Sequence, residues 1–223
     1  MVCGASQVVN DWYDRDVDAI NEPQRPIPSG RVPGYWGFYF ALAWSGLSLL
    51  WGALLGTWVM AATALGLALA WVYSAPPLRL KRNGWWGNAA VGVCYEGLAW
   101  VSGAAVLLGG ALPPGNVLLL AALYSVGAHG IMTLNDFKAI DGDLKMGIRS
   151  LPAQLGPGLA ARVACLVMIV PQLVVVALLV GWGQVWHAAL VTALVLAQLG
   201  AMLRLLRDPR ELPPWYSATR QTL

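Results

Sequence analysis

The stretch VPGYWGFYFALAWSGLSLLWGALLGTWVMAATALGLALAWVYSAPPL, residues 32–78, holds no charged side chain between Arg31 and Arg79. A helix needs about 20 apolar residues to cross a bilayer, so this run is long enough for two crossings. The pair Gly56-Thr57 near its middle offers a tight turn. The run therefore predicts a hairpin of two membrane-spanning helices.

Two further runs repeat this design. Residues 83–135 contain a single acid, Glu96, and are broken by glycines and prolines at 109–115. Residues 163–203 are uncharged and break at Gly181-Trp182-Gly183. We expect an all-α transmembrane bundle of six full spans preceded by a partial first helix. The spans are predicted near residues 34–55, 57–74, 88–110, 116–138, 159–180 and 185–206.

The charged residues support this topology. The chain is 58% hydrophobic and 11% charged, which excludes an ordinary soluble domain. Each predicted hairpin has an uncharged turn at one face, and all fourteen Lys and Arg lie in the segments at the other. Positive residues mark the cytoplasmic side, so we expect the charged face to be cytoplasmic. A net charge of +3 does not indicate a nucleic-acid partner.

The ends of the chain read differently from its middle. Residues 1–10 are apolar but too short to span, and they lead directly into an acidic cluster like the last turns of a longer helix. The other end stops at Pro213-Pro214-Trp215-Tyr216-Ser217 without a final span. We expect the chain to be a piece of a longer membrane protein, or the product of a start-site or frame error.

The first acidic cluster reads NDWYDRDVD, residues 10–18. Successive helical residues advance about 100°, so Asp11, Asp14 and Asp18 share one face with Asn10 beside them, while Asp16 points elsewhere. Bunched carboxylates repel one another unless they protonate or hold a cation. Hard oxygen ligands suit Mg²⁺, which shares its remaining sites with water and phosphate. The cluster predicts a magnesium-binding edge.

The second cluster reads NDFKAIDGD, residues 135–143, at the end of a long apolar span. Asp136 and Asp143 share a helical face, whereas Asp141 lies well off it. We expect Gly142 to interrupt the helix, which would let Asp141 turn inward. Two such clusters on one membrane face indicate Mg²⁺-diphosphate chemistry, with Asp11, Asp14, Asp18, Asp136 and Asp143 as catalytic candidates.

Basic residues follow each cluster, and diphosphate binding needs fixed cations as well as metal. The candidates for this role are Arg25, Arg79, Lys81, Lys145 and Arg149. The alternative is that they are only topological charges. Ionisable groups deep in a membrane segment indicate function by default, which applies to Glu96 and His129. An interior histidine satisfied by its neighbours is an equally good interpretation of His129.

These motifs together resemble the UbiA-type membrane prenyltransferases. The first cluster resembles the first signature of that superfamily, and DAINEPQRPIPSG (residues 18–30) is similar to its chlorophyll synthase branch, nearest to the bacteriochlorophyll synthases. YSAPPLRLK (73–81) and NGWWGN (83–88) fit the same branch. So does NDFK (135–138), continued by GD and RSLP within 142–152. At Ala139 the chain departs from the many members that carry an aspartate there, which weakens the second metal site.

The resemblance implies a nine-helix fold in one membrane-embedded domain over 1–223, here without the first helix, most of the second and the ninth. It implies Mg²⁺-dependent transfer of a geranylgeranyl or phytyl group from its diphosphate to the propionate carboxylate of bacteriochlorophyllide. Mg²⁺ would be held by Asn10, Asp141 and the five catalytic candidates. Tyr73, Glu96 and His129 are candidates for the tetrapyrrole or prenyl pocket. The implied location is the bacterial inner membrane, with the active-site loops cytoplasmic.

Two alternatives stay open. The first is a related prenyltransferase that acts on chlorophyllide, a quinone precursor or haem; residues 20–23 argue against the last two by resemblance alone. The second is a membrane protein that binds or transports pigment through Glu96 and His129. A transporter would explain the polar groups within the membrane, but not two cytoplasmic acid clusters with matching cations.

Overall fold

The computed structural model describes residues 1–209, in which every regular element is a helix and no β-strand is present. The predicted chain end at 213–217 lies outside the described residues. The chain divides into two compact units, which we describe separately. Unit 1 comprises residues 1–81 and 98–118, and unit 2 comprises residues 82–97 and those from 119 onward. That the chain forms one functional domain stays a prediction.

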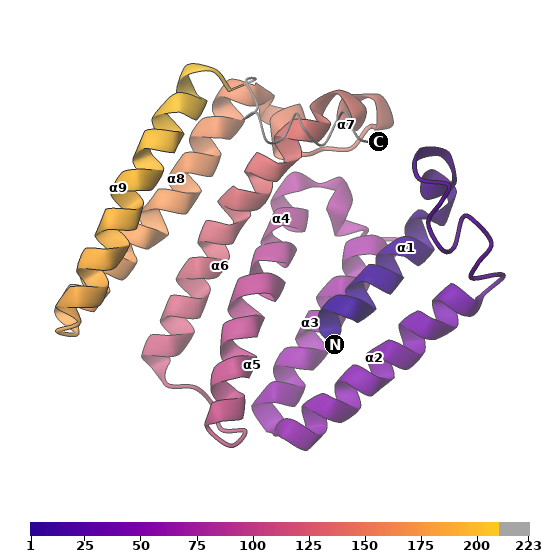
Figure 1. The fold of residues 1–223 in the computed structure, drawn as a ribbon, viewed down its shortest axis with the longest axis horizontal. Helices are drawn as coiled ribbons and strands as arrows, with labels where there is room; N and C mark the ends of the chain where they lie inside the picture. The colour runs from indigo at the N-terminus through magenta and orange to yellow at the C-terminus, as the bar shows by residue number, and fades with distance from the viewer. Residues whose placement is uncertain (210–223) are drawn as a thin grey trace. The chain divides into compact units, whose positions relative to one another are not determined.

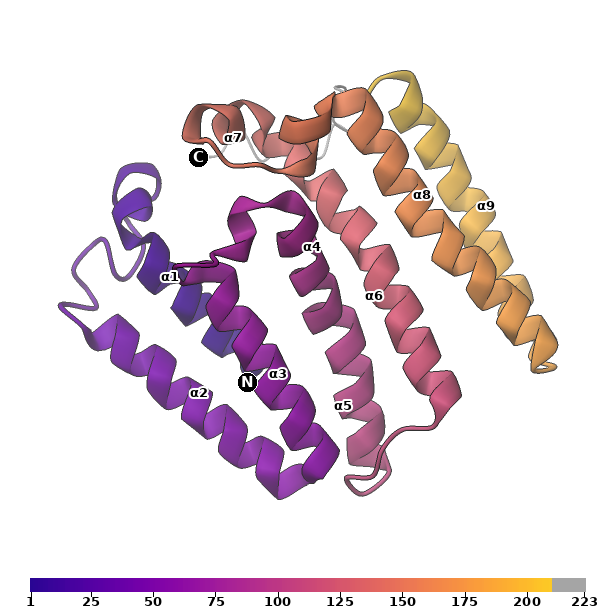
Figure 2. The same ribbon diagram turned by 180° about the vertical axis from the view of Figure 1, so that it is seen from behind.

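Unit 1 is built around α1 (Val2–Asn21), which packs against both α2 (Trp36–Leu55) and α3 (Thr57–Ser74). The helices α2 and α3 form the predicted hairpin, joined at Gly56 (Figure 1). Gly56 has φ +122°, a conformation that only glycine adopts without strain. The helix α5 (Leu98–Leu107) packs on α3, as seen from behind in Figure 2.

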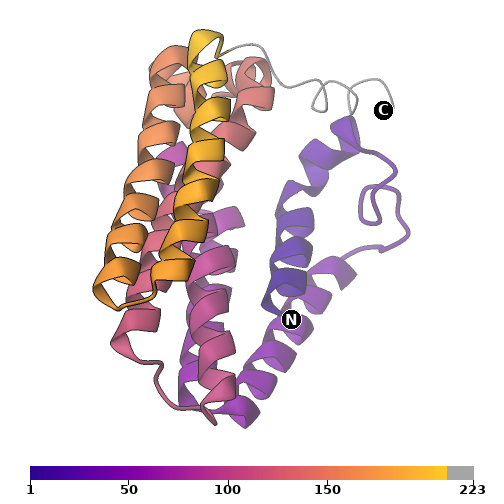
Figure 3. The ribbon, with the colours of Figure 1, turned by 60° about the vertical axis from the view of Figure 1, so that its left-hand side comes forward.

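Unit 2 contains the remaining helices. They are α4 (Gly84–Gly92), a π-helical turn (Val93–Gly97), α6 (Gly115–Asp136, from residue 119), a 3₁₀ turn (Phe137–Ala139), α7 (Ile140–Met146), α8 (Leu151–Gly181) and α9 (Val185–Arg207). A short 3₁₀ turn, Leu80–Arg82, lies at the boundary between the units. The helices α8 and α9 run side by side in opposite directions (Figure 3). Cys165 and Met168 of α8 pack there with Met202 of α9.

The structure confirms six helices that are long and apolar enough to cross a membrane in its described part. The starts of two spans differ from the prediction. The third span begins at Gly84 rather than 88, because the Asn83 side chain accepts the Trp85 backbone N–H at 3.0 Å and caps the helix. The helix α8 begins at Leu151 rather than 159, but Gly156, with φ +74° and ψ 157°, is not helical, so the long segment after this kink begins close to the predicted residue. Apolar run length reveals neither a cap nor a kink.

The helices α4 and α6 approach closely in unit 2. A Cβ atom at Gly92 would lie 2.5 Å from the Ser125 backbone oxygen, so only glycine fits. Small residues allow such close approach between membrane helices and favour hydrogen bonds across the interface. The contact brings the side chains of Asn88 and Thr133 within reach of each other.

Candidate functional site

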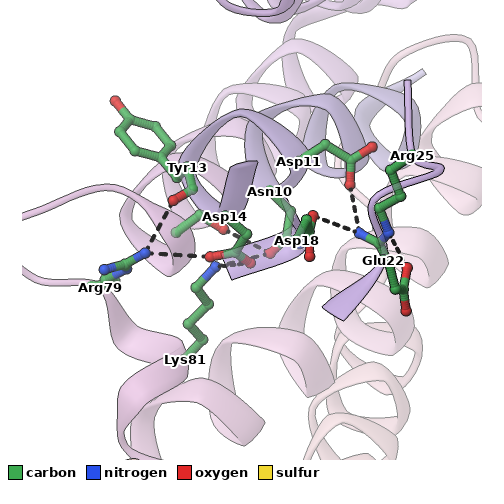
Figure 4. A network of polar contacts seen from close by, with 10 residues as sticks. Asn10, Asp11, Tyr13, Asp14, Asp18, Glu22, Arg25, Arg79 and Lys81 are labelled. Atoms are coloured by element: carbon green, nitrogen blue, oxygen red, sulfur yellow. Dashed lines mark hydrogen bonds and ion pairs between the residues drawn. The ribbon is translucent and has the colours of Figure 1, made fainter. Parts of the chain in front are cut away.

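The first acidic cluster lies on α1, which continues unbroken through it to Asn21. Asn10, Asp11, Asp14 and Asp18 all take part in a network of polar contacts, which is formed of two adjoining sets (Figure 4). Asp16 lies outside it, with its side chain 87% exposed. Helical periodicity therefore predicted correctly which aspartates share one face of α1 and which one points away.

Arg25 lies in the loop after α1 and folds back onto the helix. Its Nη1 donates to Asp11 Oδ1 and to Asp18 Oδ2, each at 3.1 Å. Its Nε donates to the Glu22 carboxylate (Figure 4). One guanidinium thus holds three acids together. Arg25 was predicted as a site residue and Glu22 was not, although the i, i+3 spacing of the two residues indicates the contact.

Two further cations reach α1 from the segment after α3. Lys81 Nζ donates to Asp14 Oδ2 at 2.5 Å and to Asn10 Oδ1 at 3.2 Å. Arg79 Nη2 donates to Asp14 Oδ1 at 3.3 Å and to the Tyr13 backbone oxygen at 3.1 Å. The structure therefore brings Arg79 and Lys81 to the first cluster, as Figure 4 shows.

Arg79 shows two signs of a functional position. Its φ of +43° lies in the left-handed region, which non-glycine residues seldom occupy unless surrounding structure imposes it. Its Nε is buried and has no hydrogen-bond partner in the described part of the chain. A buried N–H without an acceptor is costly, and a phosphate oxygen would satisfy it.

The charges of the network leave a small excess of acid. Four carboxylates (Asp11, Asp14, Asp18 and Glu22) face the three cations Arg25, Arg79 and Lys81, which gives 3 − 4 = −1. A diphosphate placed beside a net negative charge would be repelled. The excess of acid lies around Arg25, which faces three carboxylates, whereas Arg79 and Lys81 share the single carboxylate of Asp14. An added cation would offset the excess beside Arg25.

Burial perturbs two members of the network. Desolvation raises the pKa of Asp11 above its usual value, and the nearby Arg25 guanidinium partly opposes the shift. Desolvation also lowers the pKa of Lys81, with the hydrogen bond to Asp14 opposing it. Both shifts disfavour charge, so both groups gain from a ligand that brings opposite charge into the site.

The oxygens of α1 occur in pairs around bound cationic nitrogens. No group of three or more His, Cys, Asp or Glu side chains converges to hold a metal within residues 1–209. Pairs of oxygens do converge, since Lys81 Nζ contacts both Asn10 and Asp14 and Arg25 Nη1 contacts both Asp11 and Asp18. Mg²⁺ is usually held by one or two carboxylates, with water and substrate phosphates completing its shell. These pairs suit that mode of binding.

The second acidic cluster belongs to unit 2. Asp136 is the last residue of α6, and its carboxylate accepts a hydrogen bond from Asn88 Nδ2 at 3.0 Å. The predicted break at Gly142 is wrong, because Gly142 lies inside α7 and the irregular turn is at 137–139. Asp141 is exposed on α7. Asn88 was not predicted as a site residue, although an amide side chain within a membrane segment indicates a polar contact there.

The loop between α7 and α8 borders an open depression of about 410 Å³, whose lining includes Asp143, Arg149 and Gln154. The Arg149 backbone makes two hydrogen bonds to other backbone groups, from its N–H to Arg82 O (2.9 Å) and from Gly84 N–H to its own oxygen (2.7 Å). Its oxygen also accepts from Gln154 Nε2. The Arg149 side chain is exposed, as is Lys145. Arg149 is thus presented beside Asp143, whereas Lys145 lines no part of the depression.

The three pocket candidates lie in different settings. Tyr73 is half-buried in the last turn of α3. Glu96 is half-buried in the π-helical turn of unit 2, a feature frequent at functional sites. His129 is buried, and its Nε2 lies 3.2 Å from the Trp85 backbone oxygen with the Trp85 ring beside it. His129 therefore has the protein partner that the alternative interpretation required.

The chain is 57% identical over 223 residues to the bacteriochlorophyll synthase 33 kDa chain of Cereibacter sphaeroides, covering all of this chain and 74% of that protein. It is 40% identical to the chloroplastic chlorophyll synthase of Avena sativa, covering 98% of this chain and 59% of that protein.

A solved structure of digeranylgeranylglyceryl phosphate synthase superposes with a TM-score of 0.77 at 23% identity, covering 93% of this chain and 72% of that one. At this identity the likeness concerns the fold alone. The profile of the UbiA prenyltransferase family matches residues 1–221. The chain therefore belongs to the UbiA prenyltransferase family.

Proposed function

We propose that this chain transfers a geranylgeranyl or phytyl group from its diphosphate to the propionate carboxylate of bacteriochlorophyllide, and releases diphosphate. The prenyl diphosphate donor is supported by the α1 network, in which three cations surround a stripe of oxygens. The acceptor is supported by identity, which is 57% to a bacteriochlorophyll synthase and 40% to a chlorophyll synthase.

A divalent metal is the general cofactor of this family, and we propose that it is Mg²⁺ here. Asn10, Asp11, Asp14 and Asp18 are the residues of unit 1 that would hold the metal. Asp136, Asp141 and Asp143 are the candidate ligands of unit 2. When bound, the ion neutralises the negative charge that develops on the leaving diphosphate. Arg25, Arg79 and Lys81 would bind the phosphate oxygens, with Arg149 and Lys145 as further contacts. The buried Arg79 Nε is the donor best placed to gain an acceptor.

The chemistry breaks the bond between the allylic carbon and the diphosphate oxygen, and the electron pair leaves with the diphosphate. A propionate oxygen then forms the ester bond to that carbon. The propionate is already ionised at neutral pH, so no proton has to be removed and no general base is required. The basic side chains stabilise the leaving group, which is the usual largest contribution to such catalysis. Tyr73, Glu96 and His129 would line the pocket for the prenyl chain or tetrapyrrole.

The chain is an integral membrane protein with six candidate spans in its described part. We place it in the bacterial inner membrane with both acidic clusters on the cytoplasmic side. The distribution of Lys and Arg supports this orientation. Water-soluble diphosphate could then leave directly into the cytoplasm.

The test uses membranes that contain the chain, supplied with bacteriochlorophyllide and geranylgeranyl or phytyl diphosphate in the presence of Mg²⁺. Esterified pigment is measured by chromatography. We expect ester formation that EDTA abolishes and added Mg²⁺ restores. Faster esterification of chlorophyllide than of bacteriochlorophyllide would contradict the proposed acceptor. Pigment binding that survives EDTA without any ester would favour a binding protein instead.

A further inference from the structure

A buried chain of hydrogen bonds in unit 2 connects α4 to the second acidic cluster. Asn88 of α4 is 6% exposed, and Thr133 of α6 is fully buried. Asn88 Nδ2 lies 3.3 Å from Thr133 Oγ1 and 3.0 Å from Asp136 Oδ2. A single amide group therefore contacts both a buried hydroxyl and the carboxylate at the end of α6.

The donors and acceptors of this chain fix the orientation of the amide. The Thr133 hydroxyl donates its one proton to the backbone oxygen of His129 at 2.9 Å. It can therefore only accept from Asn88, which requires the NH₂ side of the amide to face it. The second hydrogen of that NH₂ group is then directed at Asp136. Thr133 thus determines which end of the amide the carboxylate meets.

We propose that Asn88 is a positioning residue for Asp136, held in its donating orientation by Thr133. The inference rests on the proposed function, in which Asp136 serves the metal-diphosphate site. Asn88 occupies Oδ2, and no other hydrogen bond to the Asp136 side chain is present among residues 1–209. Oδ1 is then the oxygen presented to a ligand, and rotation of the carboxylate is restricted.

A purely packing role does not account for this arrangement. Two desolvated polar side chains in a membrane span are costly, and an apolar pair of similar shape would fill the space at lower cost. The arrangement is explained if the carboxylate must keep one orientation. Residues that orient a metal-binding group typically change metal affinity by about 10- to 100-fold when they are removed.

The test compares the wild type with Asn88→Leu, Thr133→Val and Asp136→Asn. The matched control is Thr192→Val, because Thr192 also donates to the carbonyl four residues earlier, at 2.8 Å, on a helix far along the chain from Asn88. The readouts are the Mn²⁺ dissociation constant, measured by electron paramagnetic resonance with an unreactive prenyl thiodiphosphate, and the kcat and KM of transfer. Thermal midpoints in detergent report folding.

We expect Asn88→Leu to weaken Mn²⁺ binding about 10-fold or more, with a fall in kcat and little change in the KM for bacteriochlorophyllide. Thr133→Val should shift Mn²⁺ binding in the same direction, although it touches no ligand, and Thr192→Val should not. The Asn88→Leu/Asp136→Asn double variant should bind Mn²⁺ no more weakly than Asp136→Asn alone, because both act through one carboxylate.

Three results would overturn the inference. The first is Mn²⁺ binding unchanged in Asn88→Leu while Asp136→Asn weakens it, which leaves the proposed function intact. The second is an identical effect of Thr133→Val and Thr192→Val on Mn²⁺ binding. This result decides the question if Asn88→Leu fails to fold. The third is unchanged Mn²⁺ binding and transfer in Asp136→Asn, which would remove Asp136 from the proposed site as well.

Discussion

The Lys81 ammonium nitrogen lies 2.5 Å from Asp14 Oδ2, so a cation from the segment after α3 is fixed on the acidic stripe of α1. The Lys81 side chain is only 16% exposed, which strengthens the interaction relative to a surface ion pair. In the proposed site, this ammonium group binds the diphosphate next to the oxygens that hold the metal.

We expect Lys81→Met to raise the KM for the prenyl diphosphate about 10- to 100-fold, since a hydrogen bond to a charged group contributes about 1.5–3 kcal/mol. Lys81→Arg should recover part of the loss. Initial rates at varied prenyl diphosphate measure the effect. The control is Arg82→Met, because Arg82 is the next residue and its side chain is exposed. Equal effects at 81 and 82 would contradict a specific role for Lys81.

The raised pKa of Asp11 predicts a pH dependence. Burial is the largest cause, and Arg25 opposes it by favouring the ionised form. Asp11 should therefore protonate above the ordinary aspartate value of 3.8 as the pH falls, and kcat/KM should decrease there. Removing the opposing charge with Arg25→Gln should raise this pKa further, so the acidic limb should move to higher pH.

The measurement is kcat/KM against pH, with each variant normalised to its own maximum. Arg15→Gln serves as the control, because Arg15 pairs with the exposed Asp16 and lies outside the Asp11 network. An acidic limb that stays in place in Arg25→Gln, or that moves equally in Arg15→Gln, would show that a different group controls it.

Turnover should depend strongly on the hydrogen-bonded aspartates of each cluster and only weakly on the exposed Asp16. Asp14→Ala leaves Lys81 and Arg79 without their shared partner, and Asp136→Ala leaves the Asn88 amide without its acceptor. We expect each to lower kcat about 100-fold or more, as loss of one charge-stabilising group does in other enzymes. Asp16→Ala should retain near-normal turnover because its side chain is 87% exposed. Near-normal turnover of either cluster variant in correctly inserted protein would refute its role.

The stripe on α1 was predictable because helical geometry is local. If the helix continues through the cluster, a rotation of about 100° per residue places Asp11, Asp14 and Asp18 on one face. The hairpins were predictable for a similar reason, since an uncharged run of sufficient length has few stable alternatives in a bilayer. Both inferences need only neighbouring residues.

The partners of that stripe were less predictable because they depend on tertiary contacts. Lys81 meets Asn10 across 71 positions of sequence, and Arg79 adopts a left-handed backbone conformation that composition does not reveal. The failure at Gly142 has a different cause. Glycine lowers helix propensity by only about 1 kcal/mol, which the rest of α7 outweighs, while the actual irregularity at 137–139 contains no glycine.

The membrane orientation gives a further prediction. Single cysteines are introduced at positions 112 and 141 in a background without Cys3, Cys94 and Cys165. An impermeant thiol reagent added from outside should label position 112, in the turn between α5 and α6, and should not label position 141, near the second cluster. The positive-inside distribution of charge is the reason. Labelling at 141 without labelling at 112 would reverse the proposed topology.

The close approach of α4 and α6 gives the last prediction. A Cβ at Gly92 would lie 2.5 Å from the Ser125 backbone oxygen, a distance that backbone cannot accommodate without moving. We expect Gly92→Ala to separate the helices by a few tenths of an ångström or more and to destabilise unit 2 by about 1–3 kcal/mol, as overpacking does in other proteins. The separation should also weaken the contact from Asn88 to Thr133 and Asp136, so transfer activity should fall even at temperatures where the variant is folded.

The matched control is Gly103→Ala on α5, where an added Cβ meets nothing within 4 Å. Alanine is also the better helix former, so Gly103→Ala should be neutral or slightly stabilising. The thermal midpoint in detergent and the esterification rate are measured for both variants. A lower midpoint and a lower rate for Gly92→Ala alone would attribute the effect to the helix contact. Equal behaviour of the two variants would show that the approach of α4 to α6 does not support Asp136, because the general cost or gain of replacing glycine in a helix is the same in both.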